Sequence, residues 1–193
     1  IAPRACLSWR RGYNGKKLPS LPMPAPDIVI RLLTPADTAA FCALRLRAIL
    51  DSPSAFSSSR EDELARTPEE HVQRIAGPMQ RGFGAFDGAR LVGFAGLRRE
   101  PLRQLWHKAL LWGVFVDAPH RGKGVARRLV NACIEQAETD PAIMQVHLSV
   151  NAENNAARQL YESLGFIAYG TEPRSMRVGD LFYDEHHLAL LLK

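Results

Sequence analysis

The sequence predicts an α/β fold in which helices cover both faces of a central mixed β-sheet. Strand and helix patterns alternate along the chain in the order β-α-α-β-β-β-α-β-α-β-β, without an internal repeat. The run at 109–116 is apolar throughout, as in a strand that is covered on both faces. The segment at 125–137 instead places its apolar side chains on one helical face. Together these patterns favour layered packing of helices on a sheet.

The first strand is expected at 28–33, where the segment is rich in β-branched residues. Thr34 then offers an N-cap and Pro35 the first position of a helix that runs to about residue 50. Residues 51–60 are polar and predict a loop. A second, short helix at 68–76 carries two glutamates in its first turn, where the helix dipole favours them.

The second half of the chain starts with a hairpin at 82–97, because Asp87-Gly88 separates two β-rich runs. The apolar strand and the amphipathic helix described above follow it. Alternation at 143–150 predicts a further strand, with Met144, Val146, Leu148 and Val150 on one face. The remaining elements are expected as a helix at 153–163, a short strand at 165–170, a loop, and a strand at 181–191.

The net charge of +5 comes from one end of the chain. Residues 1–26 contain five basic residues and no acidic one, which leaves 20 of each sign in the remainder. We expect residues 1–27 to be a basic, proline-rich leader, disordered or left over from cloning, and 28–193 to be the functional domain. A neutral domain of this kind argues against nucleic acid as the partner.

The cysteines, the apolar runs and a histidine pair indicate which compartment and which partners to expect. Cys6, Cys42 and Cys133 are far apart, which argues against a disulfide framework or a zinc site and predicts a cytoplasmic protein. The longest apolar run has eight residues, too few to cross a bilayer, so we expect no membrane partner. His186-His187 would point to opposite faces of a strand, so we expect no metal site there either.

The segment Arg121-Gly122-Lys123-Gly124 lies between a strand and a helix. The first N–H groups of a helix lack partners within it, and glycines let an anion come close to them. A diphosphate suits such a site. The spacing matches neither a Walker P-loop, because Gly124 follows Lys123, nor a Rossmann fingerprint, because Arg128 replaces its third glycine.

Two motifs together resemble the GCN5-related N-acetyltransferase (GNAT) family. The family's [QR]-x-x-G-x-[GA] motif is matched by Arg121, Gly124 and Ala126, and the preceding strand ends in a shifted form of its V-x-P exit. The later N-x-x-A-x-x-L-Y-x-x-x-G-F motif is matched by Asn154, Ala157, Leu160, Tyr161, Gly165 and Phe166. The order of elements from residue 28 onwards also agrees, so the resemblance implies the GNAT fold.

The resemblance also implies where acetyl-CoA binds. The two central strands would splay apart, with Gly113 compatible with a bulge. Asn154 would lie near the thioester. The backbone expected to pair with the pantetheine arm is that of Val114, Phe115 and Val116. The groups expected to hold the diphosphate are the Arg121 side chain and the backbone N–H groups of Gly122, Lys123, Gly124, Val125, Ala126 and Arg127.

The implied reaction is acetyl transfer to an amine, which must be neutral to attack. By the resemblance, the Val116 amide would stabilise the oxyanion and Tyr161 would protonate, or hydrogen-bond to, the departing thiolate. A phenol with a pKa of about 10 stays protonated at neutral pH and can donate.

The proton acceptor is left open. The ribosomal-protein acetylases of this family carry a glutamate twelve residues before the tyrosine, where this chain has Ser149. Glu61, Glu63, Glu100 or a chain of waters could serve instead. Asp184-Glu185 either lines the acceptor site or lies on a hairpin surface.

The sequence therefore predicts an acetyl-CoA-dependent N-acetyltransferase acting on a primary amine of a small molecule or a peptide. An acyltransferase with a longer acyl-CoA, and a CoA-binding sensor or interaction module without turnover, are the alternatives. Homodimers are common in the family, and the sequence does not decide that point.

Overall fold

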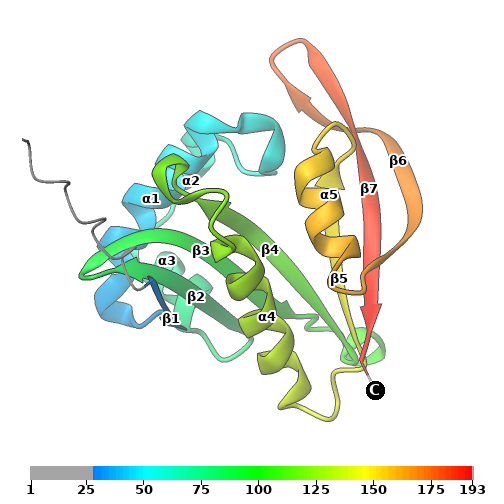
Figure 1. Ribbon diagram of the computed structural model, residues 1–193, viewed down its shortest axis with the longest axis horizontal. Helices are drawn as coiled ribbons and strands as arrows, with labels where there is room; N and C mark the ends of the chain where they lie inside the picture. The colour runs from blue at the N-terminus through cyan, green and yellow to red at the C-terminus, as the bar shows by residue number, and fades with distance from the viewer. Residues whose placement is uncertain (1–27, 193) are drawn as a thin grey trace, which may run out of the picture.

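The structure is a computed structural model that describes residues 28–192, so the leader expected at 1–27 lies outside the described residues. Its strands form one mixed sheet in the order β1-β2-β3-β4-β5-β7-β6 (Figure 1). The strands are β1 (Ile28–Leu32), β2 (Gln80–Asp87), β3 (Arg90–Arg99), β4 (Lys108–Val116), β5 (Gln145–Asn151), β6 (Ile167–Val178) and β7 (Leu181–Leu191). The α-helices are α1 (Thr38–Asp51), α2 (Arg60–Ala65), α3 (Pro68–Ala76), α4 (Val125–Glu138) and α5 (Asn155–Glu162).

Helices cover both faces of the sheet, as the sequence predicts. The apolar face of α4, with Leu129 and Cys133 fully buried, packs on β1 to β4, and Tyr161 of α5 joins the same cluster. On the opposite face, α1 and α3 bury Phe41 and Ile75 in a second cluster. The expected α/β class is confirmed, and Figure 1 shows α4 and α5 on the near side of the sheet.

The hairpin between β2 and β3 also agrees with the prediction. Asp87 and Arg90 close the ladder, and Gly88 adopts a φ of +57° in the turn, a conformation that glycine reaches without steric cost. The central strand β4 pairs antiparallel with β3 and parallel with β5. It is thus the strand at which the two halves of the sheet meet.

Helix α2 was not predicted, because the polar stretch that ends at residue 60 reads as a loop. The structure starts a helix there, and Ser59 caps it: the Ser59 hydroxyl accepts from the Asp62 N–H, and the Asp62 carboxylate accepts from the Ser59 N–H. This reciprocal capping stabilises a helix too short to show an apolar period.

The C-terminal hairpin is longer than predicted. The strand expected at 165–170 runs from Ile167 to Val178, through residues expected as a loop, and pairs with β7. Most side chains of β6 are exposed because β6 is the edge strand, so no apolar alternation marks it. The strand β5 starts one residue after Met144, which is exposed instead of joining the buried face.

Within residues 28–192, the structure contains no helix with both the length and the apolar character needed to span a bilayer.

Candidate active site

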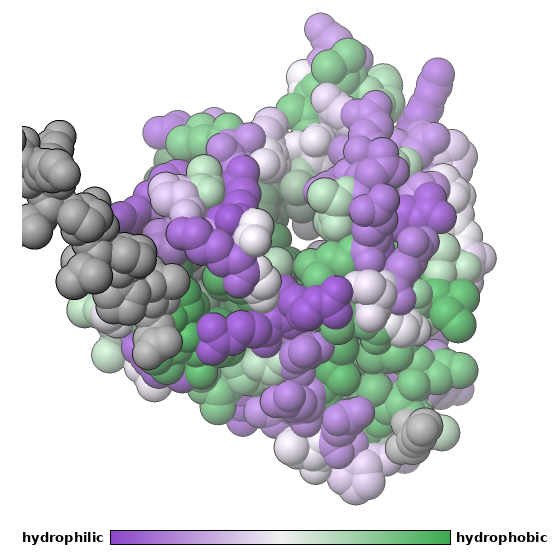
Figure 2. All heavy atoms as spheres, viewed as in Figure 1, coloured by the Kyte–Doolittle hydropathy of each residue, from purple (hydrophilic) through white to green (hydrophobic). Residues whose placement is uncertain are grey.

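A slot opens where the parallel strands β4 and β5 separate. They pair only where Lys108, Ala109 and Leu110 face 145–147; beyond that, β4 stays with β3 and β5 stays with β7. A cavity of about 260 Å³ fills the gap, and the space-filling view shows a hollow there with a largely hydrophilic rim (Figure 2). Its walls come from β4, β5, α5 and the side chains of α1 and α3.

A β-bulge in β4 lies beside this slot. Trp112 pairs with Gly96 and Phe115 with Phe94, so Gly113 and Val114 together face the single residue Ala95. Gly113 has a φ of +67°, in the region that favours glycine. The bulge bends β4 near the point where β5 departs, which agrees with the splay that the family resemblance implies.

The bulge leaves backbone groups of β4 free to face the slot. The N–H of Asp117, just after β4, donates to the Val92 carbonyl of β3 at 2.8 Å. Successive residues of a strand direct their backbone groups to opposite sides, so Phe115 also faces β3 while Val114 and Val116 face away from it. Of the three residues expected to pair with a pantetheine arm, Val114 therefore presents its N–H and C=O groups and Val116 its N–H group, while the Val116 carbonyl accepts from Arg121.

The glycine loop ends at an open helix N-terminus. Gly122 and Gly124 have φ values of +72° and +75°, and Gly124 is the N-cap of α4 without a side-chain capping bond. A Cβ on either glycine would meet no atom within 4 Å. Within residues 28–192, the N–H groups of Val125, Ala126 and Arg127 donate to no backbone carbonyl, as a phosphate-binding turn requires.

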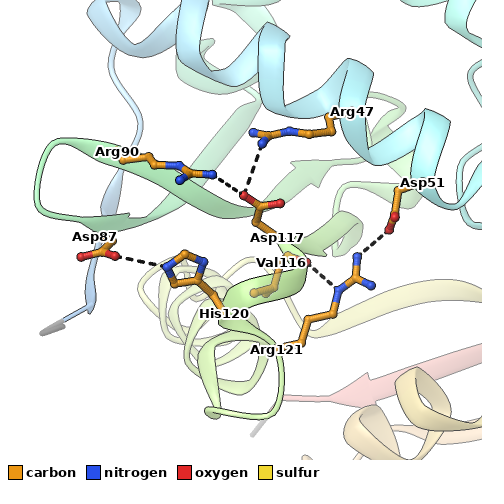
Figure 3. A network of polar contacts seen from close by, with 8 residues as sticks. All are labelled: Arg47, Asp51, Asp87, Arg90, Val116, Asp117, His120 and Arg121. Atoms are coloured by element: carbon orange, nitrogen blue, oxygen red, sulfur yellow. Dashed lines mark hydrogen bonds and ion pairs between the residues drawn. The ribbon is translucent and has the colours of Figure 1, made fainter. Parts of the chain in front are cut away.

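The basic residues of this loop contact protein groups. The Arg121 guanidinium donates to the Val116 carbonyl at 2.9 Å and to Asp51 of α1 at 2.6 Å (Figure 3). Lys123 donates to the Pro119 carbonyl at 2.9 Å. Arg127 donates to the Ser163 hydroxyl at 2.7 Å, which links the start of α4 to the end of α5.

A second set of polar contacts fixes the loop from the side of β2 and β3. Buried Asp117 accepts from Arg90 at 2.8 Å and from Arg47 at 3.3 Å, and buried His120 lies 3.2 Å from Asp87 (Figure 3). The loop is thus tied to α1 and to the β2–β3 hairpin. A rigid loop of this kind can hold its N–H groups in place for an anion.

Tyr161 projects from α5 into the other wall of the slot. The residue is only 8% exposed, and its ring packs edge-to-face on Phe166. Burial, with a smaller effect of Cys133, raises the pKa of the Tyr161 hydroxyl well above its usual range. Asn154 also lines the slot, and its side chain caps α5 by accepting from the Ala157 N–H at 3.1 Å.

Comparison with known proteins identifies the family. The model of the acetyltransferase (GNAT) family matches residues 46–166. The chain belongs to the GNAT acetyltransferase family.

Two curated relatives are named acetyltransferases, and a solved structure shares the fold. A mycothiol acetyltransferase from Brachybacterium faecium is 31% identical over 88% of this chain and 50% of its own length. The N-alpha-acetyltransferase RimI of Mycobacterium tuberculosis is 32% identical over 58% of this chain and 67% of its own. The yncA protein of Salmonella typhimurium, solved with its cofactor acetyl-CoA, superposes with a TM-score of 0.74 at 20% identity, over 86% of this chain and 95% of its own.

These comparisons confirm the expected family and fold. The chain spans about half the length of the mycothiol acetyltransferase that it matches. The donor of GNAT acetyltransferases is acetyl-CoA. The acceptor is not defined by family membership.

The three glutamates expected near this GNAT site differ in position. Glu61 is exposed on α2. Glu63 is buried, and although burial raises its pKa, Arg74 and Arg45 outweigh that effect and hold it below its ordinary value. Glu100 follows β3 and bonds to the backbone of Lys108, at the closed end of the slot.

Glu185 lies in the slot itself. It sits on β7 opposite Asn151 of β5, lines the same cavity as Tyr161, and accepts from the Ser175 hydroxyl at 2.7 Å. The sequence offered two places for Asp184-Glu185, the acceptor site or a hairpin surface. The structure places Glu185 at the slot and leaves Asp184 exposed.

The wall formed by Arg45 and Arg74 was missed by the sequence analysis. Arg45 lies on the buried face of α1 and Arg74 on α3, and both line the cavity. An arginine on an otherwise apolar helical face was the available signal, because such a residue must find a buried partner.

Proposed function

We propose that this chain transfers the acetyl group of acetyl-CoA to a primary amine of a small molecule or peptide. The observation that carries the proposal is the slot between β4 and β5. Val114 of β4 and Tyr161 of α5 line one cavity there, and the chain continues from β4 through Val116 and the glycine loop to the open N-terminus of α4. The expected cytoplasmic location and homodimer stay predictions.

The cofactor would lie along this slot with its diphosphate at the glycine loop. The N–H groups from Gly122 to Arg127 would hold the phosphates, and Arg121 and Lys123 would add positive charge nearby. The pantetheine arm would pair with the backbone of Val114 and Val116 as an added strand. This pose places the thioester between the end of β4 and Tyr161, close to Asn154.

The chain would then stabilise the charges that develop in the reaction. As the amine nitrogen bonds to the acetyl carbon, the carbonyl oxygen becomes an oxyanion that the Val116 N–H can stabilise. The C–S bond then breaks and leaves the CoA thiolate. Because its pKa is raised, Tyr161 holds its proton more firmly than a thiol does and stabilises the thiolate as a hydrogen-bond donor.

Glu185 is the group best placed to take the amine proton. It lines the slot on the side of β5 and β7, and its carboxylate is held by Ser175. A carboxylate that reaches the nitrogen directly or through one water suffices for this step. The remaining candidates lie on the surface, in a buried ion pair, or at the closed end of the slot.

Substitution of Tyr161 tests the proposal. We expect Tyr161→Phe to lower kcat about 10- to 100-fold, because the hydrogen bond to the thiolate is lost, with near-normal acetyl-CoA binding. Tyr169→Phe is the matched control, since Tyr169 is 62% exposed on β6. Thiol release with an amine panel measures turnover, and calorimetric titration of acetyl-CoA, with ATP as the control ligand, measures binding.

Two results would contradict the proposal. Absence of acetyl-CoA binding would reject the cofactor site as a whole. Unchanged kcat in Tyr161→Phe would reject the role of Tyr161 and leave the cofactor site standing.

A further inference from the structure

Two guanidinium groups form part of the cavity wall on the α1 and α3 side. Arg45 is 2% exposed, and the side chain of Arg74 is 16% exposed. Both are held in place by aromatic rings: Arg45 lies 4.5 Å from the centre of Phe56, and Arg74 lies 4.7 Å from that of Trp112. A charged group that is buried and held in this way normally has a full set of partners.

The negative charge around these arginines is too small. A single Glu63 oxygen accepts from Arg45 at 3.1 Å and from Arg74 at 2.7 Å, while Arg66 lies 3.9 Å from the other oxygen. Three cations therefore surround one carboxylate. Burial, followed by the repulsion of Arg74, lowers the pKa of Arg45 to about 10, so the charge is held at a cost.

Three buried atoms of this cluster lack a hydrogen-bond partner within residues 28–192: Nε of Arg66, Oε2 of Glu63 and Nη1 of Arg45. Of these atoms, Nη1 of Arg45 is the donor that borders the slot. It lies near Gly113 of β4, since a Cβ built on that glycine would come within 3.1 Å of it. The unpaired donor thus faces the bulged strand that borders the slot. An acceptor with negative charge, supplied by a ligand, would satisfy it.

The opposite wall of the cavity has the opposite charge. Residues directly paired in an antiparallel ladder share a face, so Glu185 lies on the same face of the sheet as Asn151. The Asn151 amide donates to the Ser54 carbonyl, just after α1, which places this face toward α1. Glu185 and the two arginines thus flank the slot on the same side of the sheet, the side away from Tyr161 and α5.

We propose that the acceptor is an amine that also carries a carboxylate, of which an α-amino acid is the simplest example. Its carboxylate would bind Arg74 and Arg45, and its amine would face Glu185 and the thioester. The inference rests on the proposed acetyl transfer. It narrows the acceptor class, because an amine without an anionic group leaves the arginine wall uncompensated.

Matched acceptors test this inference. The full chain is assayed for thiol release with acetyl-CoA and the twenty L-amino acids, and with the carboxamide of each, which keeps the amine and removes the negative charge. We expect the best acids to exceed their amides in kcat/KM about 10- to 100-fold. Arg74→Gln should abolish that ratio mainly by raising KM for the acids. Arg60→Gln, on the exposed face of α2, should preserve it.

A binding experiment separates this inference from the proposed activity. The same acids and amides are titrated calorimetrically into the protein saturated with CoA. Preferential binding of acids that is lost in Arg74→Gln supports the carboxylate subsite. If such binding is seen without turnover, the acetyl-transfer proposal is rejected and the subsite stands. Equal turnover of acids and amides, or an acid preference that survives in Arg74→Gln, overturns the subsite and leaves acetyl transfer intact. Failure of every acid to bind also overturns it.

Discussion

At the scale of single residues, four glutamates of similar intrinsic chemistry have different surroundings. Glu61 is exposed to solvent, Glu63 is enclosed by guanidinium groups, and Glu100 lies at the closed end of the slot. Glu185 alone among the four lines the cavity. A general base must first be within reach of the proton that it removes, so position separates these residues more sharply than residue type does.

Substitution of Glu185 is the corresponding prediction. Glu185→Gln keeps the shape and the capacity to accept from Ser175 but cannot accept a proton at neutral pH. We expect kcat/KM to fall about 100-fold, the lower end of the effect of a general base. Acetyl-CoA affinity, measured by calorimetry, should stay unchanged. Glu61→Gln is the control, and a comparable loss in that variant would instead indicate a base on α2.

A second prediction concerns Gly124, whose φ of +75° and open surroundings coincide with the expected diphosphate position. In Gly124→Val, a β-branched residue is forced into the left-handed region and its side chain enters that space. We expect the Kd for acetyl-CoA to rise at least about 10-fold and stability to fall about 1–2 kcal/mol.

The control for Gly124 is a glycine with the same strain in another place. Gly179 has a φ of +59° in the β6–β7 turn, with nothing within 4 Å of a built Cβ. Gly179→Val should lose similar stability and keep its acetyl-CoA affinity. If both variants bind acetyl-CoA as the wild type does, the diphosphate does not lie at the glycine loop.

At the scale of elements, α2 depends on its cap because it has only six residues. Isolated helices of this length are unstable, and capping bonds offset part of that cost. We expect Ser59→Ala to destabilise the protein by about 1 kcal/mol, measured by urea unfolding. Ser58→Ala, one residue earlier in the same turn, should be near neutral. Equal effects of both substitutions would show that the cap contributes nothing specific.

The elements also show where prediction from the sequence succeeds. α4 and β4 were found because their apolar periods reflect burial on one face or on both. β6 was cut short because an exposed edge strand has no such period, and α2 was missed although its Ser59-x-x-Asp62 cap could have been read. The splayed strands came from the family resemblance. The Arg45–Glu63–Arg74 cluster depends on three helices meeting in space, which local sequence patterns do not specify.

At the scale of the molecule, the sheet is two units that share only the first three residue pairs of β4 and β5. Beyond those pairs, β1 to β4 carry the glycine loop, and β5 to β7 with α5 carry Tyr161 and Glu185. The Arg127–Ser163 bond is one of the links across the open end. Because the two units supply different parts of the site, a ligand along the slot would contact both and hold them together.

The acid stability of the whole fold provides the last prediction, through Glu63, which joins α1, α2 and α3. Its pKa is below the ordinary value in the folded protein, so the unfolded chain takes up the proton first as the pH falls. The stability that Glu63 contributes is therefore complete above its unfolded pKa of about 4.3 and is lost below it. Removing the charge leaves the buried Arg45 and the partly buried Arg74 without their counter-ion, which costs about 3–5 kcal/mol. We expect Glu63→Gln to be less stable than the wild type at pH 7 in urea unfolding, and the difference to shrink between about pH 5 and pH 3.

Asp37→Asn is the control, because it removes a carboxylate whose pKa is also lowered, chiefly by Arg31. That pair lies at the surface, so the loss of stability at pH 7 should be smaller. A Glu63→Gln variant whose stability runs parallel to that of the wild type over this range would show that Glu63 is not the acid-sensitive link between the three helices.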